Sequence, residues 1–172
     1  MIHEKMEKAF NEQINKELYS SYLYLSMAGY FQNLGLSGFA NWMRVQVQEE
    51  NFHAMKMFDY VINRGGKVIL EAIAKPQYEW KSALEVFEET LKHEEYVTSL
   101  IYKLSDVADE VKDRASISFL QWFIDEQVEE EATASDIIAK LKLISDNGDA
   151  LYAMDKEFTT RVFTPPADKT AN

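Results

Sequence analysis

The sequence predicts an all-α protein: an antiparallel four-helix bundle with one long crossover between the second and third helices, plus a short fifth C-terminal helix. A chain of 172 residues is long enough for one domain with a substantial core. Only six glycines and three prolines, with 47% hydrophobic residues, favour long uninterrupted helices. In four long segments the hydrophobic residues recur every three or four positions, which is the period of an amphipathic helix. We therefore expect a single domain over residues 1–163 and a mobile C-terminal tail over residues 164–172.

The first two helices are expected over residues 4–32 and 38–64. The first segment carries a helical pattern without interruption, and Glu17 falls at the middle of its apolar face. A short turn follows, with Ser37 as the expected N-cap of the second helix, and Gly65 and Gly66 end that helix. The inward stripes of the two helices are Phe10, Ile14, Glu17, Ser21, Tyr24, Ala28 and Phe31, then Phe39, Met43, Gln46, Glu50, His53, Met57 and Tyr60.

The segment over residues 65–81 contains Pro76 and has little helical periodicity. About sixteen extended residues reach roughly 50 Å, whereas a helix of about 27 residues is roughly 40 Å long. The segment can therefore run the length of the bundle, which would leave the second and third helices parallel. Residues 67–73 are also able to pair as a short strand with a partner subunit, and the sequence leaves this open.

The remaining helices are expected over residues 83–108, 113–145 and 149–161. Ser82 and Glu85 form a capping-box pattern at the start of the third helix, and Asn147 and Gly148 separate the fourth helix from the fifth. The inward stripes of the third and fourth helices are Phe87, Leu91, Glu94, Thr98 and Ile101, then Leu120, Phe123, Gln127, Glu130, Ala134, Ile137 and Leu141.

Composition limits the classes of partner. A net charge of −11 disfavours nucleic acid and favours cations. The chain has no cysteine, which excludes disulfides, thiolate metal sites and thiol catalysis, and fits a reducing cytoplasm. The first residues lack the pattern of a signal peptide, and hydrophobic residues are spread out rather than continuous. We therefore expect a cytoplasmic protein with no membrane partner.

Polar residues interrupt the four apolar stripes at a matched spacing. From Glu17 to Glu50 is 33 positions, and from Glu94 to Gln127 is again 33. Measured from the turns near residues 35 and 111, the residues of each half lie roughly 22–29 Å along their helices. Packing one hairpin on the other would therefore gather six side chains in one layer at mid-bundle: Glu17, Glu50, His53, Glu94, Gln127 and Glu130.

Four buried carboxylates at one level need compensating charge, because each desolvated ion costs several kcal/mol. Protons or metal ions must supply it. Oxygen ligands with one imidazole, that of His53, suit iron, manganese or zinc, and two ions bridged by a shared carboxylate would satisfy the set. A wrong helix phase is the alternative explanation for any single buried glutamate, although four independent stripes argue against it.

Two further groups of residues have both a structural and a functional interpretation. Tyr24 lies seven residues after Glu17 on the same face, where it is either plain core or a redox-active, hydrogen-bonding neighbour of the metals. The acidic residues on one side of the fourth helix, beside Glu49 of the second, form either a solvated face or a third cation site. These residues are Glu126, Glu129 and Glu130.

The chain resembles prokaryotic non-haem ferritins, members of the ferritin-like di-iron family. The resembling segments are NEQINKELYSSYLYLSMA, GFANWMRVQVQEENFHAMKMFDY, LKHEEYV and FLQWFIDEQVEEEA, within residues 1 to about 166. The resemblance implies a first iron site at Glu17, Glu50 and His53, and a second at Glu50, Glu94 and Glu130, with Glu50 bridging. It also implies that Gln127 lies beside the second iron, that Tyr24 is the site tyrosine, and that a third iron site uses Glu49, Glu126, Glu129 and Glu130.

The chain differs from three related families in residues that define them, which favours the non-haem ferritins. Bacterioferritins carry a second Glu-x-x-His motif where this chain has Gln127 and Glu130, and a haem-ligating methionine where it has Asn51, so no haem is expected. Rubrerythrins add a cysteine-rich iron domain, which a chain without cysteine cannot have. Mini-ferritins that coat DNA lack the fifth helix and build their iron site between subunits, whereas here all ligands lie in one chain.

The resemblance implies iron storage and detoxification by a ferroxidase, which oxidises Fe²⁺ to Fe³⁺ with O₂ or peroxide. The ferric mineral would collect inside a hollow homo-oligomeric shell, usually of 24 subunits. Three aromatic residues expected to be exposed, Tyr30, Tyr78 and Trp80, would serve subunit contacts. Two other classes stay open from the residues alone: a di-metal redox enzyme acting on a small organic substrate or peroxide, and a structural bundle that binds no metal.

Overall fold

The computed structural model describes residues 1–145 and 147–165, and within these ranges it contains five α-helices and no strand. The predicted fold class is confirmed, and the first four helices agree closely with their expected ranges. Residues 166–172 of the predicted mobile tail lie outside the described residues. The helices are α1 (Glu4–Asn33), α2 (Ser37–Asn63), α3 (Ala83–Glu110), α4 (Arg114–Ile144) and α5 (Gly148–Phe158).

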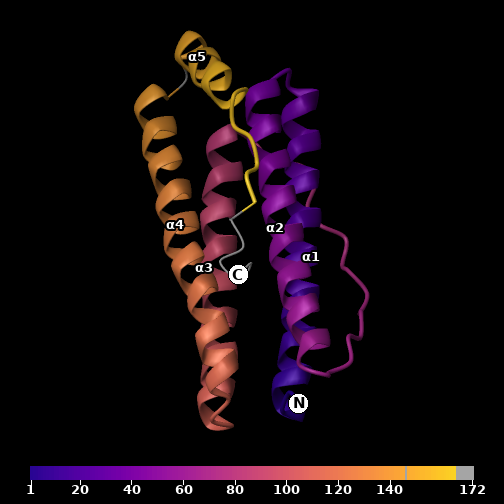
Figure 1. The fold of residues 1–172 in the computed structure, drawn as a ribbon. Coiled ribbons are helices and arrows are strands. Elements are labelled where there is room, and N and C mark those ends of the chain that lie inside the picture. The colour runs from indigo at the N-terminus through magenta and orange to yellow at the C-terminus, as the bar shows by residue number, and fades with distance from the viewer. Residues whose placement is uncertain (146, 166–172) are drawn as a thin grey trace.

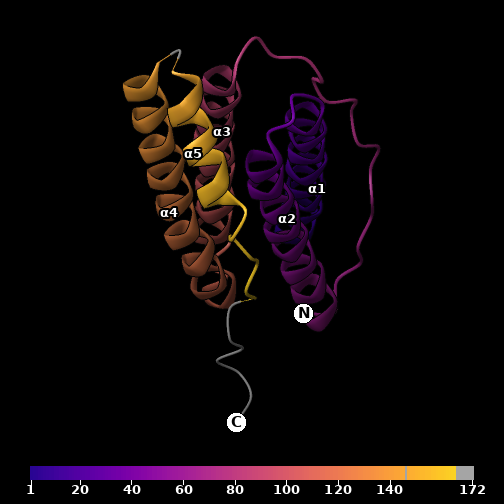
Figure 2. The same ribbon diagram turned by 90° about the horizontal axis from the view of Figure 1, so that it is seen from above.

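Two antiparallel hairpins stand side by side (Figure 1): α1 with α2, and α3 with α4. α1 packs against α3, while α5 lies at one end of the bundle and contacts α2 and α4. The crossover of residues 64–82 runs along the outside of the α1–α2 hairpin (Figure 2), so α2 and α3 run in the same direction. None of the helices in the described ranges has the length and hydropathy of a membrane-spanning segment.

The start of the crossover is tied to α1 by side chains. Asn11 accepts a hydrogen bond from Ile69 N at 2.7 Å and donates one to Lys67 O at 2.9 Å. Glu7 accepts a third from Lys67 N at 3.1 Å. Residues 67–73 have no regular secondary structure, and part of their backbone is already paired within the chain. Pairing of this segment with a partner strand stays a prediction, and it would have to use the remaining backbone groups.

Two hydrophobic clusters lie toward opposite ends of the bundle, and a polar layer lies between them. One cluster includes Phe31, Phe39 and Phe87, all with 0% exposure. The other, toward the far end, includes Phe10, Met57, Ile101 and Leu120. Each side chain is buried among apolar neighbours, which supplies most of the driving force for packing the hairpins. The polar layer is therefore enclosed by apolar clusters on both sides along the bundle.

Trp80 is buried rather than exposed, so the predicted exposure of its side chain is wrong. Only 8% of its surface is accessible, and its ring packs edge-on against Tyr30 at a centroid distance of 5.4 Å. Its indole nitrogen donates to Glu89 at 3.3 Å. Tyr30 is itself half-buried, whereas Tyr78 is exposed. The end of the crossover folds this indole back onto the hydrophobic cluster, which the sequence pattern did not indicate.

The N-terminus of α2 is capped by a residue of α5, not by Ser37. Ser37 is the first helical residue, and the residue before it makes no side-chain capping bond. The carboxylate of Asp155 instead accepts hydrogen bonds from Gly38 N at 2.7 Å and Phe39 N at 2.9 Å. A Cβ on Gly38 would lie 1.6 Å from the carbonyl oxygen of Asp155, so only glycine permits this approach. These contacts fix α5 against α2.

α5 ends at Phe158, three residues before its expected end. The hydroxyls of Thr159 and Thr160 donate to the carbonyls of Lys156 and Glu157 at 2.7 and 3.0 Å. Hydroxyls that bond nearby carbonyls compete with helical hydrogen bonding. The following residues then leave α5 and run back along α2.

Candidate metal centre

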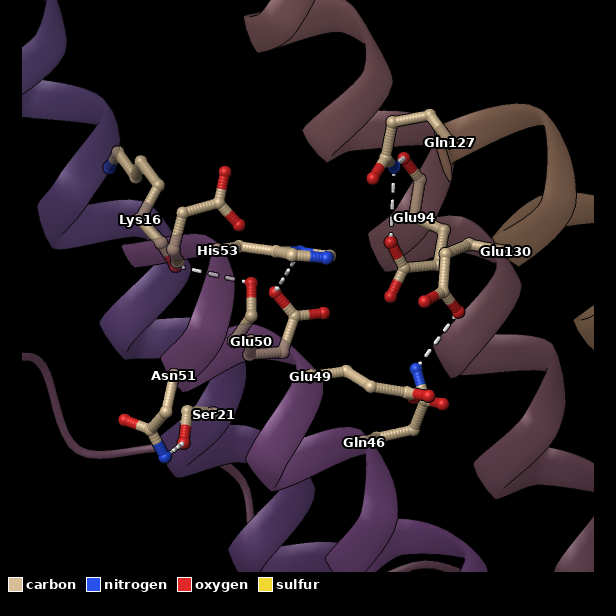
Figure 3. A network of polar contacts seen from close by, with 12 residues as sticks. Lys16, Ser21, Gln46, Glu49, Glu50, Asn51, His53, Glu94, Gln127 and Glu130 are labelled. Carbon is tan, nitrogen blue, oxygen red and sulfur yellow. Dashed lines mark hydrogen bonds and ion pairs between the residues drawn. The ribbon is translucent and has the colours of Figure 1, made fainter. Parts of the chain in front are cut away.

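The tightest group of possible metal donors lies between α1 and α2. One donor atom from each of Glu17, Glu50 and His53 lies within 4.8 Å of the others. All three side chains are buried, with exposures of 1%, 1% and 4%. The His53 Nδ1 atom is 3.6 Å from Glu50 Oε2, as Figure 3 shows. The 33-residue interval and the three-residue step thus place these groups as the sequence predicted.

The facing hairpin contributes Glu94 from α3 and Gln127 from α4. The Gln127 amide donates to Glu94 Oε2 at 3.1 Å (Figure 3). It also donates to Thr98 Oγ1 at 3.2 Å. Glu130, one turn along α4, accepts a hydrogen bond from Gln46 of α2 at 2.9 Å. In the part of the chain that the structure describes, neither Glu94 nor Glu130 belongs to a group of three possible metal donors whose atoms lie within 4.8 Å of one another. These two carboxylates are instead held by neutral amides.

Tyr24 reaches the centre of the layer from α1. Its side chain has 0% exposure, and its hydroxyl donates a short hydrogen bond to Glu94 Oε1. Burial, and then the negative charge of Glu94, raise the pKa of the Tyr24 phenol well above its ordinary value. Tyr24 therefore stays protonated and orients Glu94 through this hydrogen bond. Its role as a redox-active neighbour of bound metals stays a prediction.

Burial shifts every titratable group of the layer toward its neutral form. It raises the pKa of Glu17, and it raises that of Glu50 further because Glu94 and Glu17 repel its charge. Burial also raises the pKa of Glu94 to about 8 and that of Glu130 to about 7. The same cause lowers the pKa of His53 to about 4, so its imidazole is neutral at pH 7. No side chain of this group supplies positive charge.

Two carboxylate oxygens in the layer have unmet bonding capacity. Among the described residues, Glu17 Oε2 and Glu50 Oε2 are buried and have no hydrogen-bond partner. Gln13 satisfies the other oxygen of Glu17 at 2.8 Å. Buried polar atoms normally find a partner, and an exception calls for an ion, water or proton. Oxygen atoms of this kind beside a neutral imidazole fit iron, manganese or zinc.

The predicted third group of acidic residues lies next to Glu130. Burial raises the pKa of Glu49, Arg161 lowers it, and the charges of Glu126 and Glu129 raise it. Glu49 Oε2 is 2.8 Å from the guanidinium of Arg161. Figure 3 shows Glu49 and Gln46 reaching from α2 toward Glu130. The charges of Glu126 and Glu129 thus act on Glu49, and an arginine is paired with that carboxylate. A third cation site at these residues stays a prediction.

Sequence reasoning missed several residues that support this layer. Gln13 precedes Glu17 by four positions on the same helix face, so helical spacing alone indicates their contact. The helical period assigns Gln46 to the inward stripe, but nothing in the pattern indicates its contact with Glu130. Arg161 is the last residue of the expected fifth helix, and its partner Glu49 is 112 positions away. A contact over that separation leaves no local signal.

Comparison with known proteins agrees with this architecture. The family model described as a ferritin-like domain matches residues 7–144. A bacterial non-heme ferritin of Bacteroides fragilis (strain 638R) is 47% identical over 161 residues, which cover 94% of this chain and 100% of that protein. A bacterial non-heme ferritin of Staphylococcus saprophyticus is 43% identical over 163 residues, which cover 95% of this chain and 98% of that protein.

Solved structures give the same result. An open pore ferritin from the hyperthermophilic archaeon Archaeoglobus fulgidus has a TM-score of 0.93 and 55% identity, covering 94% of this chain and 100% of that one. A humanized archaeal ferritin has a TM-score of 0.95 and 56% identity, covering 96% and 100%. The matches span nearly the whole chain in both sequence and fold. The chain therefore belongs to the ferritin-like domain family, among the ferritins.

Proposed function

We propose that this ferritin chain stores and detoxifies iron, and that its polar layer is a di-iron ferroxidase centre. The observation that carries the proposal is the pair of buried oxygens without a partner among the described residues, Glu17 Oε2 and Glu50 Oε2. A cation would satisfy both oxygens and offset the repulsion between the carboxylates. The neutral imidazole of His53 completes a donor set that suits iron.

Fe²⁺ is the substrate in this proposal and occupies two positions. Glu50 would serve both iron positions, because a carboxylate has two oxygens and can bridge two ions. Gln127 and Tyr24 complete the catalytic set beside Glu94, to which both donate hydrogen bonds. The first position would use Glu17, Glu50 and His53, and the second would use Glu50, Glu94 and Glu130.

The proposed reaction moves two electrons. Each Fe²⁺ loses one electron, and O₂ takes both together with two protons to become H₂O₂. Peroxide can replace O₂, taking two electrons and two protons to become two water molecules. Carboxylates favour the product because hard anionic oxygens stabilise Fe³⁺. The uncharged Gln127 would hold Fe³⁺ less firmly at the second position, which lets the product leave.

The product would pass a third iron position formed by the acidic residues of α2 and α4. Glu49 and Glu130 lie close enough that the charge of Glu49 raises the pKa of Glu130. The other proposed ligands are Glu126 and Glu129. The proposal includes no haem, because Asn51 and Gln127 stand where bacterioferritins carry other residues.

Storage requires a container, so the proposal includes a hollow homo-oligomeric shell, with 24 copies as the expected number. A single bundle encloses no space for a mineral. Exposed aromatic and aliphatic side chains on α1 and the crossover, such as Tyr22, Leu25 and Tyr78, are available for contacts between copies. We also propose a cytoplasmic location, with no membrane partner and no nucleic-acid partner, since a net charge of −11 repels nucleic acid.

Gel filtration followed by anaerobic addition of Fe²⁺ tests this proposal. A shell of 24 chains of 19.9 kDa would elute as a particle of about 480 kDa. We expect that particle to turn amber when air is admitted and to keep the colour in the same fraction. A small oligomer that oxidises iron but retains none would instead indicate a di-metal enzyme for another substrate. A protein that binds no iron would refute the proposal.

A further inference from the structure

The segment after α5, residues 159–165, forms a C-terminal strap along α2. Figures 1 and 2 both show it running from α5 back between the two hairpins. Asn41 of α2 anchors it by donating to Phe158 O at 3.0 Å and to Arg161 O at 2.9 Å. Further along, Phe163 packs against Phe52 at a centroid distance of 6.0 Å. The strap therefore lies beside the α2 residues that flank the metal centre.

Arg161 is held by α2 on several sides. Its guanidinium lies over the Trp42 ring, 4.4 Å from the centroid, and donates to the Trp42 carbonyl at 3.1 Å. It also donates to Gln46 Oε1 at 2.6 Å and to Glu49 Oε2 at 2.8 Å. Three-quarters of its side chain is shielded from solvent, since the exposed fraction is 25%. This arrangement holds a positively charged guanidinium within the acidic group.

The arginine also acts on Glu130 through an amide. Guanidinium groups only donate hydrogen bonds, so Gln46 must present its oxygen to Arg161 and its nitrogen to the opposite side. That nitrogen donates to Glu130 Oε2 at 2.9 Å. Gln46 has 0% exposure, so no solvent competes for either end of its amide. Arg161 therefore engages two of the four proposed ligands of the third iron position, Glu49 directly and Glu130 through Gln46.

We propose that Arg161 is a resident counter-ion of the third iron position. The guanidinium neutralises Glu49 and keeps Gln46 bonded to Glu130, so an incoming cation meets positive charge and two occupied carboxylates. The third position then binds iron weakly and acts as a point of transit rather than a store. This inference rests on the proposed function, and it assigns the strap a role in setting the affinity of that position.

Anaerobic Fe²⁺ titration of the assembled protein by calorimetry tests the inference, with redox-inert Zn²⁺ as a second probe. The Arg161→Gln variant is expected to bind the third ion about tenfold more tightly or better, because a unit charge near the ligands is removed. Arg161→Lys keeps the charge but loses the guanidinium fork, and it is expected to bind the third ion with an affinity between those of the parent protein and of Arg161→Gln. Arg44→Gln removes the same charge from an exposed position of α2 and is the matched control.

The outcomes are distinguishable. A third-ion affinity in Arg161→Gln that is unchanged or weaker, with two tight ions still bound, would overturn the role of Arg161 while leaving the ferroxidase proposal intact. Absence of tight binding in the parent protein would instead defeat the proposed function itself. Should Arg161→Gln fail to assemble, Arg161→Met provides the same comparison, because its apolar stem still covers the Trp42 ring.

Discussion

Replacing Glu50 with alanine is expected to slow the rapid phase of Fe²⁺ oxidation by about a hundredfold or more, since a shared bridging ligand serves both metal positions. Glu50 belongs to the tight donor group with Glu17 and His53, and the charges of Glu94 and Glu130 act on it from the other hairpin. Removing it takes away one ligand from each position at once. Stopped-flow absorbance of the ferric product over the first seconds measures this effect.

The same substitution is expected to leave the fold and the assembly intact. Burial and the neighbouring carboxylates raise the pKa of Glu50 well above its ordinary value. Its ionised form therefore destabilises the metal-free folded protein, and removing it does not weaken the fold. Glu95→Ala is the matched control, because Glu95 lies on the exposed side of α3 beside Glu94. Oxidation as fast in Glu50→Ala as in this control would exclude Glu50 as the bridging ligand.

The metal-free protein is expected to lose stability as the pH rises from 6.5 to 8. Folding raises the pKa of Glu94 to about 8 and that of Glu130 to about 7, so these carboxyls stay protonated in the folded protein and ionise in the unfolded one. The unfolded state therefore binds fewer protons, and its stability relative to the folded state increases with pH. Each such carboxyl lowers the free energy of unfolding by about 1.4 kcal/mol per pH unit until its folded pKa is reached.

Two buried histidines act in the opposite direction at lower pH. Burial lowers the pKa of His53 and of His93 from 6.5 to about 4, so both oppose the carboxyls mainly below pH 6.5, and their effect fades as the pH rises above that value. Thermal unfolding of the metal-free protein at several pH values measures the slope. Glu94→Gln should make it shallower, and bound Zn²⁺ should remove most of it by compensating the ionised carboxylates. A metal-free protein that gains stability from pH 6.5 to 8 would contradict this electrostatic description.

Much of the layer was predictable because helices have a fixed period. The period assigns Glu17, Glu50, His53 and Glu94 to inward faces, and short turns fix their height along the bundle, so spacing alone predicts that they meet. The structure places Glu17, Glu50 and His53 together in this way. Their binding of iron, like that of the other proposed ligands, stays a prediction.

The rest depended on contacts that no local pattern encodes. Ser37 has the side chain of an N-cap, but Asp155, more than a hundred positions later, takes that role. Trp80 follows a segment without periodicity, so its burial depends on how the crossover returns to the bundle. Arg161 reaches Glu49 only because α5 ends early and the strap turns back along α2. Each of these features is decided by tertiary packing, which overrides local preference.

The central claim is that two hairpins bring their carboxylates together around two cations, and metal-soaked crystals test it most directly. Anomalous diffraction after soaking with Fe²⁺ under argon, or with Zn²⁺, is predicted to give two peaks about 3.5–4 Å apart in the polar layer. One peak should lie among Glu17, Glu50 and His53, and the other should lie between Glu50, Glu94 and Glu130. A single peak, or no peak between the hairpins, would contradict the account.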